Sequence, residues 1–302
     1  MATVVVFGGG GFFGRRLVDR LSAESVTVRV AVRHPEPARI ELRSLGFDRV
    51  MVVCADVRDQ GSVEAAIAGA DAVVDAVSAY VEKGGVTFEA VHVRGAENVA
   101  REAVAAGVAR FVLVSGIGAD RYSSSPYIRS RGRGEVMVQQ AFPRTTIVRP
   151  GAMFGPGDAL FATLAELARL LPVLPLIGGG TRLQPVFVED VAKAITNILS
   201  DPGTVGQTYE LAGPRVYTLR ELVNMTLQLM GKRRLLVAVP FAVAEIQARL
   251  FEFLPNPPLT TGQVDLLKMD NVASKTLPGF QDLKIRPKTV EEVLPTYIGP
   301  VH

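Results

Sequence analysis

The chain has 302 residues, of which 48% are hydrophobic, and it carries a formal net charge of +3. This length suffices for one large domain or for a main domain with a smaller one. The mild charge, without a dense Lys/Arg tract, argues against nucleic-acid binding, and no apolar run approaches the length that spans a bilayer. The single cysteine, Cys54, excludes an internal disulfide. We interpret Cys54 as core filling, because the apolar residues 51–53 before it predict a buried strand.

A glycine-rich turn follows the first predicted strand. Apolar residues 4–7 predict a buried strand that runs directly into four glycines. Residues 15–21 then show the apolar spacing of a helix. This order is typical of a dinucleotide site, in which backbone N–H groups and the positive helix end face the pyrophosphate. We expect Gly8, Gly11 and Gly14 to keep side chains out of the tight turn, the phosphate approach and the strand–helix contact, respectively.

Alternating strand and helix patterns continue along the chain. Strands are predicted at residues 26–32, 50–54, 72–77, 111–114 and 145–148, and helices at 38–45, 62–68 and 87–106. This order predicts an α/β protein with a Rossmann-type doubly wound parallel sheet and a smaller, mainly helical C-terminal region. Residues 1–150 are expected to form the nucleotide-binding core, with a returning strand and helix near 184–212. The substrate or partner region then comprises residues 151–183 and 213–302.

Residues that directly follow the strands are the candidate cofactor contacts, because ligands of such sheets bind beyond the carboxyl ends of the strands. They are Gly8, Gly11, Phe12, Phe13 and Gly14 after the first strand, Arg33 after the second, Asp56 and Val57 after the third, Ala76, Val77 and Ser78 after the fourth, and Arg149 and Pro150 at the end of the sixth.

Arg33 favours NADP(H) over NAD(H). It stands where an acid would bind the ribose 2′-hydroxyl of NAD. A guanidinium there suits a 2′-phosphate, although a solvated arginine at a strand end is the alternative. Asp56 could either accept a hydrogen bond from the adenine amino group or cap the following helix.

A serine, a tyrosine and an arginine form a second candidate site. Pro126 predicts a helix start, which places Tyr127 and Arg131 four residues apart on one helix face. A fixed cation beside a tyrosine stabilises its phenolate, so Tyr127 could exchange a proton with a carbonyl or hydroxyl during hydride transfer. Ser115, at the end of the fifth strand, could hold the same substrate oxygen. The competing interpretation is that Tyr127 is a packed aromatic ring and that Arg131 is a surface charge.

Ser115, Tyr127 and Arg131 resemble the catalytic pattern of the short-chain dehydrogenase/reductase superfamily. The superfamily pattern is Tyr-x-x-x-Lys, however, and residues 84–192 contain no lysine. Arginine can still favour a phenolate, but it cannot relay a proton as lysine can.

Later motifs are similar to those of extended and atypical, epimerase/dehydratase-like members of this superfamily. They lie at residues 149–158, 184–192 and 206–222. The run 258–272 is similar to the family named for the alpha-subcomplex subunit nine of respiratory complex I. This resemblance implies a tightly held NADP(H). It also implies an accessory subunit near the membrane in the mitochondrial complex, whereas bacterial relatives are often free-standing.

Three functions are consistent with this sequence. The first is an NADP(H)-dependent oxidoreductase acting on a carbonyl, quinone or sugar-nucleotide substrate. The second is a non-catalytic NADP(H)-holding accessory or sensor protein on respiratory complex I, and the third is a sugar-nucleotide epimerase or dehydratase. The expected partners are a dinucleotide and a small molecule, with complex I or the membrane surface as alternatives. Because the first apolar stretch is only a strand, we expect no signal or transit peptide and a cytoplasmic location, with a peripheral position at the inner membrane left open.

Two stretches of the C-terminal half have specific interpretations. Residues 235–254 predict an apolar helix that packs over the substrate cleft or docks on a membrane or partner. Residues 171–180 predict a Pro/Gly-rich loop that could close as a lid over the nicotinamide. The histidines, His34, His92 and His302, are too scattered to nominate as metal ligands.

Overall fold

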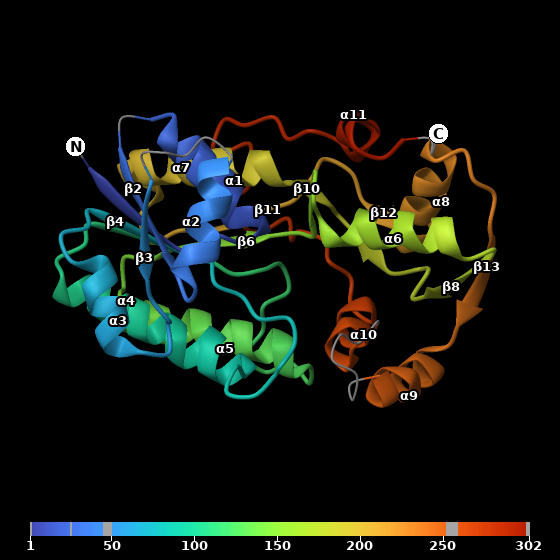
Figure 1. Cartoon of the computed structure of the whole chain (residues 1–302), viewed down its shortest axis with the longest axis horizontal. Helices are drawn as coiled ribbons and strands as arrows, with labels where there is room; N and C mark the ends of the chain where they lie inside the picture. Colours follow the sequence, from blue (N-terminus) through green and yellow to red (C-terminus); the bar gives the residue numbers. More distant parts are fainter. Residues whose placement is uncertain (1, 25, 45–49, 252–258, 300–302) are drawn as a thin grey trace. The chain divides into compact units, whose positions relative to one another are not determined.

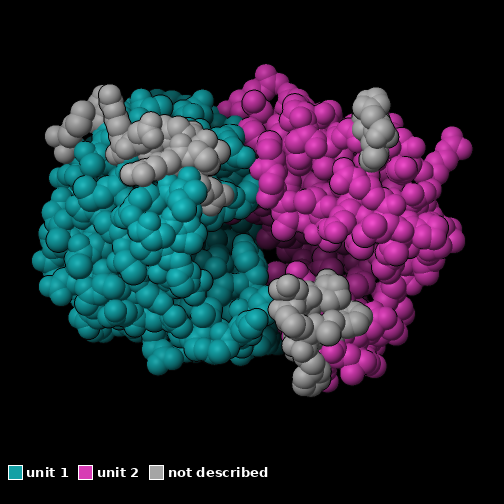
Figure 2. All heavy atoms as spheres, in the orientation of Figure 1, with its two compact units in different colours: residues 1–150, 188–211, 275–285 teal, residues 151–187, 212–274, 286–302 magenta. Residues whose placement is uncertain are grey.

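The computed structural model describes residues 2–24, 26–44, 50–251 and 259–299, which form two compact units (Figure 1, Figure 2). Unit 1, teal in Figure 2, comprises Met1–Pro150, Val188–Leu211 and Lys275–Ile285. Unit 2, magenta in Figure 2, comprises Gly151–Phe187, Ala212–Ser274 and Arg286–His302. The segment Lys275–Ile285, which the sequence analysis places in the C-terminal region, packs in unit 1.

A seven-stranded parallel sheet forms the centre of unit 1 (Figure 1). Its order is β11-β6-β5-β4-β1-β2-β3, and all neighbours pair in parallel. The strands are β1 (Thr3–Phe7), β2 (Thr27–Val32), β3 (Met51–Cys54), β4 (Ala72–Asp75), β5 (Arg110–Val114), β6 (Thr146–Pro150) and β11 (Thr208–Leu211). The order reverses between β1 and β4, which is the doubly wound arrangement that places ligands at the carboxyl ends of these strands. The predicted Rossmann-type fold is confirmed.

Helices cover both faces of the sheet. They are α1 (Phe12–Ser22), α2 (Pro35–Ser44), α3 (Gln60–Ile67), η1 (Glu89–Gly95), α4 (Ala96–Ala105), α5 (Pro126–Ala141), α7 (Val188–Ser200) and η2 (Pro202–Thr204). Figure 1 shows α3, α4 and α5 on one face and α1 and α7 on the other. The single helix predicted over residues 87–106 is two elements, because η1 is a π-helix that continues into α4. Leu45, the last residue of the predicted second helix, lies outside the described residues.

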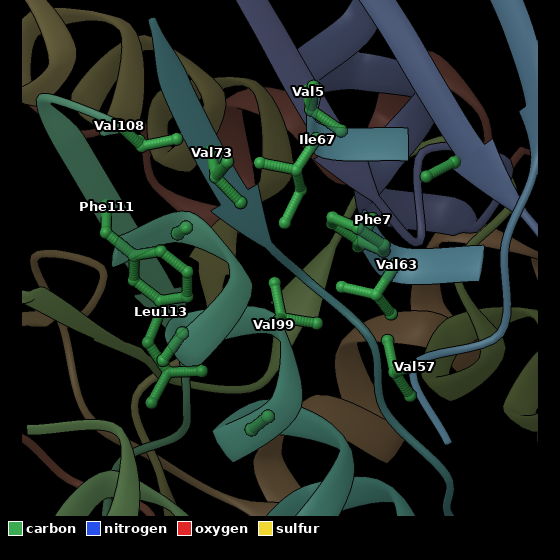
Figure 3. Close-up of a cluster of buried hydrophobic side chains, with 14 of the residues drawn as sticks. Val5, Phe7, Val57, Val63, Ile67, Val73, Val99, Val108, Phe111 and Leu113 are labelled. Carbon is green, nitrogen blue, oxygen red and sulfur yellow. The ribbon is translucent and has the colours of Figure 1, made fainter. Parts of the chain in front are cut away.

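A hydrophobic core lies between the sheet and helices α3 to α5 (Figure 3). Side chains alternate along each strand, so Phe7, Val73 and Phe111 point to the same face. They pack with Ile67 and Val99 from the helices, and all five side chains are fully buried. Each contributes about 1.5–3 kcal/mol through burial. This core therefore fixes the strands β1, β4 and β5, whose carboxyl ends carry the candidate site.

Cys54 is exposed and does not belong to the core. It ends β3, which is the edge strand of the sheet and has a neighbouring strand on one side alone. Met51 on the same strand is 51% exposed. The interpretation of Cys54 as core filling is therefore wrong, because an apolar run does not reveal whether its strand is central or at an edge.

Unit 2 combines pairs of short strands with helices. The pairs are β7 (Met153–Phe154) with β10 (Val186–Phe187), β8 (Val173–Ile177) with β13 (Leu235–Val239), and β9 (Arg182–Leu183) with β12 (Tyr217–Thr218). The helices are α6 (Ala159–Leu170), α8 (Leu219–Leu229), α9 (Phe241–Phe251), α10 (Thr261–Leu267), α11 (Val290–Val293) and η3 (Leu294–Thr296).

Two sequence predictions in unit 2 need correction. Residues 173–177 of the predicted lid loop form β8, and residues 235–239 of the predicted apolar helix form β13. The two strands pair with each other, and this pairing decides between strand and helix for short apolar runs that suit both. Helix α9 accounts for much of the remaining stretch, and residues 252–254 lie outside the described residues. In the described part of the chain, no helix has both the length and the apolar character needed to cross a membrane.

Candidate functional site

The glycine turn brings β1, β4 and α1 into close contact. Gly8 has a φ of +77°, and a Cβ there would lie 2.8 Å from the carbonyl oxygen of Ala76, just after β4. A Cβ at Gly14, within α1, would lie 2.1 Å from the carbonyl oxygen of Gly8. Glycine is therefore needed at Gly8 for its backbone conformation and at Gly14 for the approach of the helix to the turn. The strand–helix contact expected at Gly14 is present.

The first turn of α1 fits the pyrophosphate of a dinucleotide. The helix begins at Phe12 with Gly11 as its N-cap, and no acidic residue occupies its first turn. The amide groups of this turn have no acceptor within the helix, so they can bind an anion. Gly11 is exposed, and among the described residues a Cβ there would contact only the Gly8 carbonyl oxygen, at 3.3 Å. The residues present therefore suit a dinucleotide phosphate at this end of the helix.

The exits of β2 and β3 bring Arg33 near Asp56. Arg33 is exposed, and its carbonyl oxygen accepts a hydrogen bond from Cys54 Sγ at 3.7 Å. The Asp56 carboxylate accepts hydrogen bonds from Nε of Arg58 at 2.9 and 3.1 Å. These bonds are the main reason that the pKa of Asp56 is lowered, and the charge of Arg33 adds to the effect. The capping alternative for Asp56 is wrong, because Asp59 is the N-cap of α3.

Arg131 connects the exits of β4 and β5. Its Nη2 donates to Ser78 Oγ and its Nη1 to the carbonyl oxygen of Val114, both at 3.2 Å. Its buried Nε has no hydrogen-bond partner among the described residues. Arg131 is half-buried, so it is not a solvated surface charge.

Ser115 directly follows Val114 and is 4% exposed. Within the described part of the chain, its Oγ also lacks a hydrogen-bond partner. A buried polar group left in this state costs about 1–3 kcal/mol. Ser115 and Arg131, which contacts the neighbouring Val114, thus both carry unpaired polar atoms at the carboxyl edge of the sheet. Such atoms are a feature of sites that receive a ligand.

Aromatic rings surround Tyr127. Its ring stacks on Tyr80, with the centroids 5.6 Å apart, and meets Phe88 and His92 edge-on at 5.5 Å each. The Cζ atom of Arg131 lies 5.7 Å from the centroid of the Tyr127 ring, so the predicted neighbours are together. The pKa of Tyr80 is raised, chiefly because a negative charge on Tyr127 would oppose its ionisation.

Sequence reasoning did not single out Asp75, the last residue of β4. Its side chain is 3% exposed, and its Oδ1 accepts a hydrogen bond from the Val77 N–H at 3.1 Å. Burial raises the pKa of Asp75 to about 6, against the opposing effects of this hydrogen bond and of the Arg131 charge. The available signal was a single carboxylate inside an otherwise apolar strand. Tyr80, Phe88 and His92 were also missed as neighbours of Tyr127.

Arg149 is engaged within unit 1. Its Nε donates to Glu135 Oε1 at 2.9 Å, and its Nη1 lies 3.9 Å from Glu210 Oε1. The cofactor contacts assigned to Arg149 and Pro150 stay predictions. The same holds for the contacts of the other strand-exit residues. Among the described residues, no group of three or more His, Cys, Asp or Glu side chains could hold a metal ion.

Comparison with known proteins agrees with this geometry. A family model described as NAD(P)H-binding matches residues 8–202. The chain therefore belongs to the NAD(P)H-binding family, as the glycine motif predicts. It is similar to the mitochondrial NADH dehydrogenase [ubiquinone] 1 alpha subcomplex subunit 9 of Arabidopsis thaliana, with 34% identity over 295 residues, covering 93% of this chain and 73% of that protein.

Two further relatives have other names. A protein named ceramide reductase from Caulobacter vibrioides is 34% identical over 239 residues, covering 78% of this chain and 73% of that protein. The solved structure of dTDP-glucose 4,6-dehydratase from Streptomyces venezuelae, with NAD bound, has a TM-score of 0.75 and 22% identity. It covers 98% of this chain and 95% of that one, and it supports the fold alone.

We predict that Gly14→Ala lowers the free energy of unfolding by about 1–3 kcal/mol or more, because the new methyl group overlaps the Gly8 carbonyl. Gly10→Ala is the matched control, since its Cβ would meet nothing closer than Val32 Cγ1 at 3.5 Å. Urea unfolding of the two variants checks this. Equal midpoints would contradict the close approach of α1 to the turn.

We predict that Asp75→Asn stabilises the protein near pH 7.5 but not near pH 4. The pKa of Asp75 is raised from 3.8 in the unfolded chain to about 6 in the folded protein. Between these two pH values the folded protein keeps the carboxyl proton, whereas the unfolded chain has released it. Wild-type stability from this group is therefore lost as the pH rises from about 4 to about 6. Asparagine removes that loss, a gain on the order of 1–3 kcal/mol above pH 6. Urea unfolding at both pH values measures it, and a gain independent of pH would contradict the assignment.

Proposed function

We propose that this protein is an NADP(H)-dependent oxidoreductase in which Tyr127 exchanges a proton with the substrate. The observation that carries the proposal is the cluster of Tyr127, Arg131 and Ser115 at the carboxyl edge of the sheet. A buried tyrosine ring lies beside the Arg131 guanidinium, which donates to the carbonyl oxygen of Val114. The next residue, Ser115, has a buried hydroxyl with no partner within the described residues. A carbonyl or hydroxyl oxygen of a substrate would satisfy that hydroxyl.

Each side chain of the cluster has a distinct role in this proposal. Bound NADP(H) supplies or accepts the hydride. Tyr127 donates its proton to the substrate oxygen during reduction and takes it back in the reverse direction. Arg131 stabilises the resulting phenolate by its charge, and because arginine keeps its proton, the proton of Tyr127 is restored from solvent. Ser115 Oγ donates a hydrogen bond to the same substrate oxygen.

The preference for NADP(H) over NAD(H) rests on Arg33. Its exposed guanidinium stands at the exit of β2, where a 2′-phosphate would lie, and two N–H groups can bind such a phosphate together. Asp56, at the exit of β3, is proposed to accept a hydrogen bond from the adenine amino group. The turn of Gly8, Gly11 and Gly14 receives the pyrophosphate.

Similarity to the protein named ceramide reductase supports a reductase. We propose a carbonyl, quinone or sugar-nucleotide compound as its substrate. A second candidate is a non-catalytic NADP(H)-holding accessory or sensor protein associated with respiratory complex I. It is favoured by the similarity to a named complex I subunit and by Arg131 in the position of the superfamily lysine. The oxidoreductase is proposed as cytoplasmic, and the accessory protein as peripheral at the inner membrane.

Tyr127→Phe tests the proposal against this second candidate. Phenylalanine keeps the ring contacts with Tyr80, Phe88 and His92, so folding and NADPH binding are expected to persist. Loss of the hydroxyl should lower turnover by about a hundredfold or more, because it removes the proton donor. Oxidation of NADPH with phenanthrenequinone and a panel of aldehydes as acceptors measures this. Equal turnover in wild type and Tyr127→Phe, or no turnover in either, would overturn the oxidoreductase and leave the accessory function.

A further inference from the structure

A single imidazole links two segments of the candidate site. His92 is 4% exposed and lies within the π-helix η1, a helix type that is frequent at functional sites. Its Nε2 lies 3.0 Å from the backbone nitrogen of Ala79, in the loop after β4. Its Nδ1 lies 2.9 Å from Ser130 Oγ on α5, and that hydroxyl donates to the carbonyl oxygen of Tyr127 at 2.7 Å.

These contacts fix the protonation state of the ring. The Ala79 N–H is a donor, so Nε2 must be the acceptor and the single proton of the neutral ring must lie on Nδ1. Nδ1 then donates to Ser130 Oγ, which in turn donates onward to Tyr127. Burial, together with the nearby charge of Arg131, lowers the pKa of His92 to about 2, so the ring stays neutral at ordinary pH. The hydrogen bonds therefore all point the same way, from the loop after β4 through His92 to Ser130 and Tyr127 on α5.

The loop that His92 holds carries two groups that contact Tyr127, the proposed proton donor, and Arg131, its neighbouring cation. Ser78 Oγ accepts a hydrogen bond from Arg131, and the ring of Tyr80 stacks on Tyr127. Ala79 lies between these two residues, so its anchored backbone sets the position of both.

The contact between η1, which carries His92, and α5 is equally constrained. A Cβ at Gly134, on α5, would lie 1.9 Å from the carbonyl oxygen of His92, so η1 and α5 touch through their backbones. The His92 ring itself stacks on Phe88, with the centroids 5.7 Å apart. The imidazole consequently has little freedom to move away from either contact.

We propose that His92 is a positioning residue, which as a neutral bridge holds residues 78–80 against Tyr127 and Arg131. This inference rests on the oxidoreductase function proposed above. His92 acts on the reaction through the groups it places, and it has no direct role in proton transfer. A displacement of these groups by about 1 Å would be expected to lower turnover by up to a hundredfold.

Three substitutions separate the two contacts of the ring. In His92→Gln, the side-chain oxygen can reach the position of Nε2 and accept from the Ala79 N–H. In His92→Asn, the shorter amide can reach the position of Nδ1 and contact Ser130, but not the loop. His92→Leu removes both contacts and keeps an apolar side chain of similar bulk.

Hydrogen exchange of the Ala79 amide tests the bridge without a substrate. We expect slow exchange in wild type and His92→Gln, and fast exchange in His92→Asn and His92→Leu, measured well below the thermal midpoint of each variant. Fast exchange in wild type, or slow exchange in His92→Leu, would overturn the inference. A variant that fails to fold does not remove the test, because the wild-type amide and His92→Gln still decide it.

Turnover of NADPH with phenanthrenequinone tests the positioning role. We expect kcat to fall about tenfold or more in His92→Leu, with NADPH affinity within about twofold of wild type, and to recover in His92→Gln. If Tyr127→Phe abolishes turnover while His92→Leu retains it, the inference about His92 fails alone. If Tyr127→Phe has no effect, the oxidoreductase proposal fails, and the exchange of the Ala79 amide still decides whether the bridge exists.

Discussion

The contact between α1 and the glycine turn is the constraint on which the nucleotide site depends. The helix can approach β1 because Gly14 has no side chain where it meets the Gly8 carbonyl. This approach directs the unpaired amides of the first helical turn toward the carboxyl edge of the sheet. The turn at Gly8 also approaches Ala76 closely, at the exit of β4, which pairs with β1 in the sheet. An anion-binding helix end thus lies where the strand order reverses.

Arg131 is the main departure from the superfamily pattern, and the structure gives it partners that a lysine could not bind in the same way. Its planar fork reaches Ser78 and Val114 at once, which joins the exits of β4 and β5. The guanidinium lies next to the Tyr127 ring while Nε remains without a partner among the described residues. Arg131 is therefore a fixed charge held by residues at the exits of two strands.

The sequence predicted the sheet of unit 1 well, because each strand is a short apolar run and each is separated from the next by a helical pattern. The clustering of Arg131 with Tyr127 also followed from their spacing on one helix. Other features could not be predicted from the sequence, for physical reasons. Strands β8 and β13 are apolar runs that become strands through their pairing with each other. The π-helical segment has the same apolar spacing as an α-helix at this length.

The ring of aromatic neighbours around Tyr127 was missed for a related reason. Tyr80 comes from a loop, Phe88 directly precedes η1 and His92 lies in the middle of η1, so it is the fold that brings them to α5. Asp75 was overlooked because an acid in a central strand looks like an interruption of the pattern. Its burial, and hence its raised pKa, depends on the strands and helices packed around it.

Equilibrium titration of the purified protein with NADPH and with NADH, after removal of any retained nucleotide, decides whether unit 1 binds a dinucleotide and which one it prefers. We predict that NADPH binds at least about tenfold more tightly than NADH, since a charge-assisted hydrogen bond contributes about 1.5–3 kcal/mol. It also predicts that Arg33→Ala abolishes this preference. Binding of neither dinucleotide would contradict the claim that unit 1 holds NADP(H). A preference that survives in Arg33→Ala would contradict the assignment of Arg33.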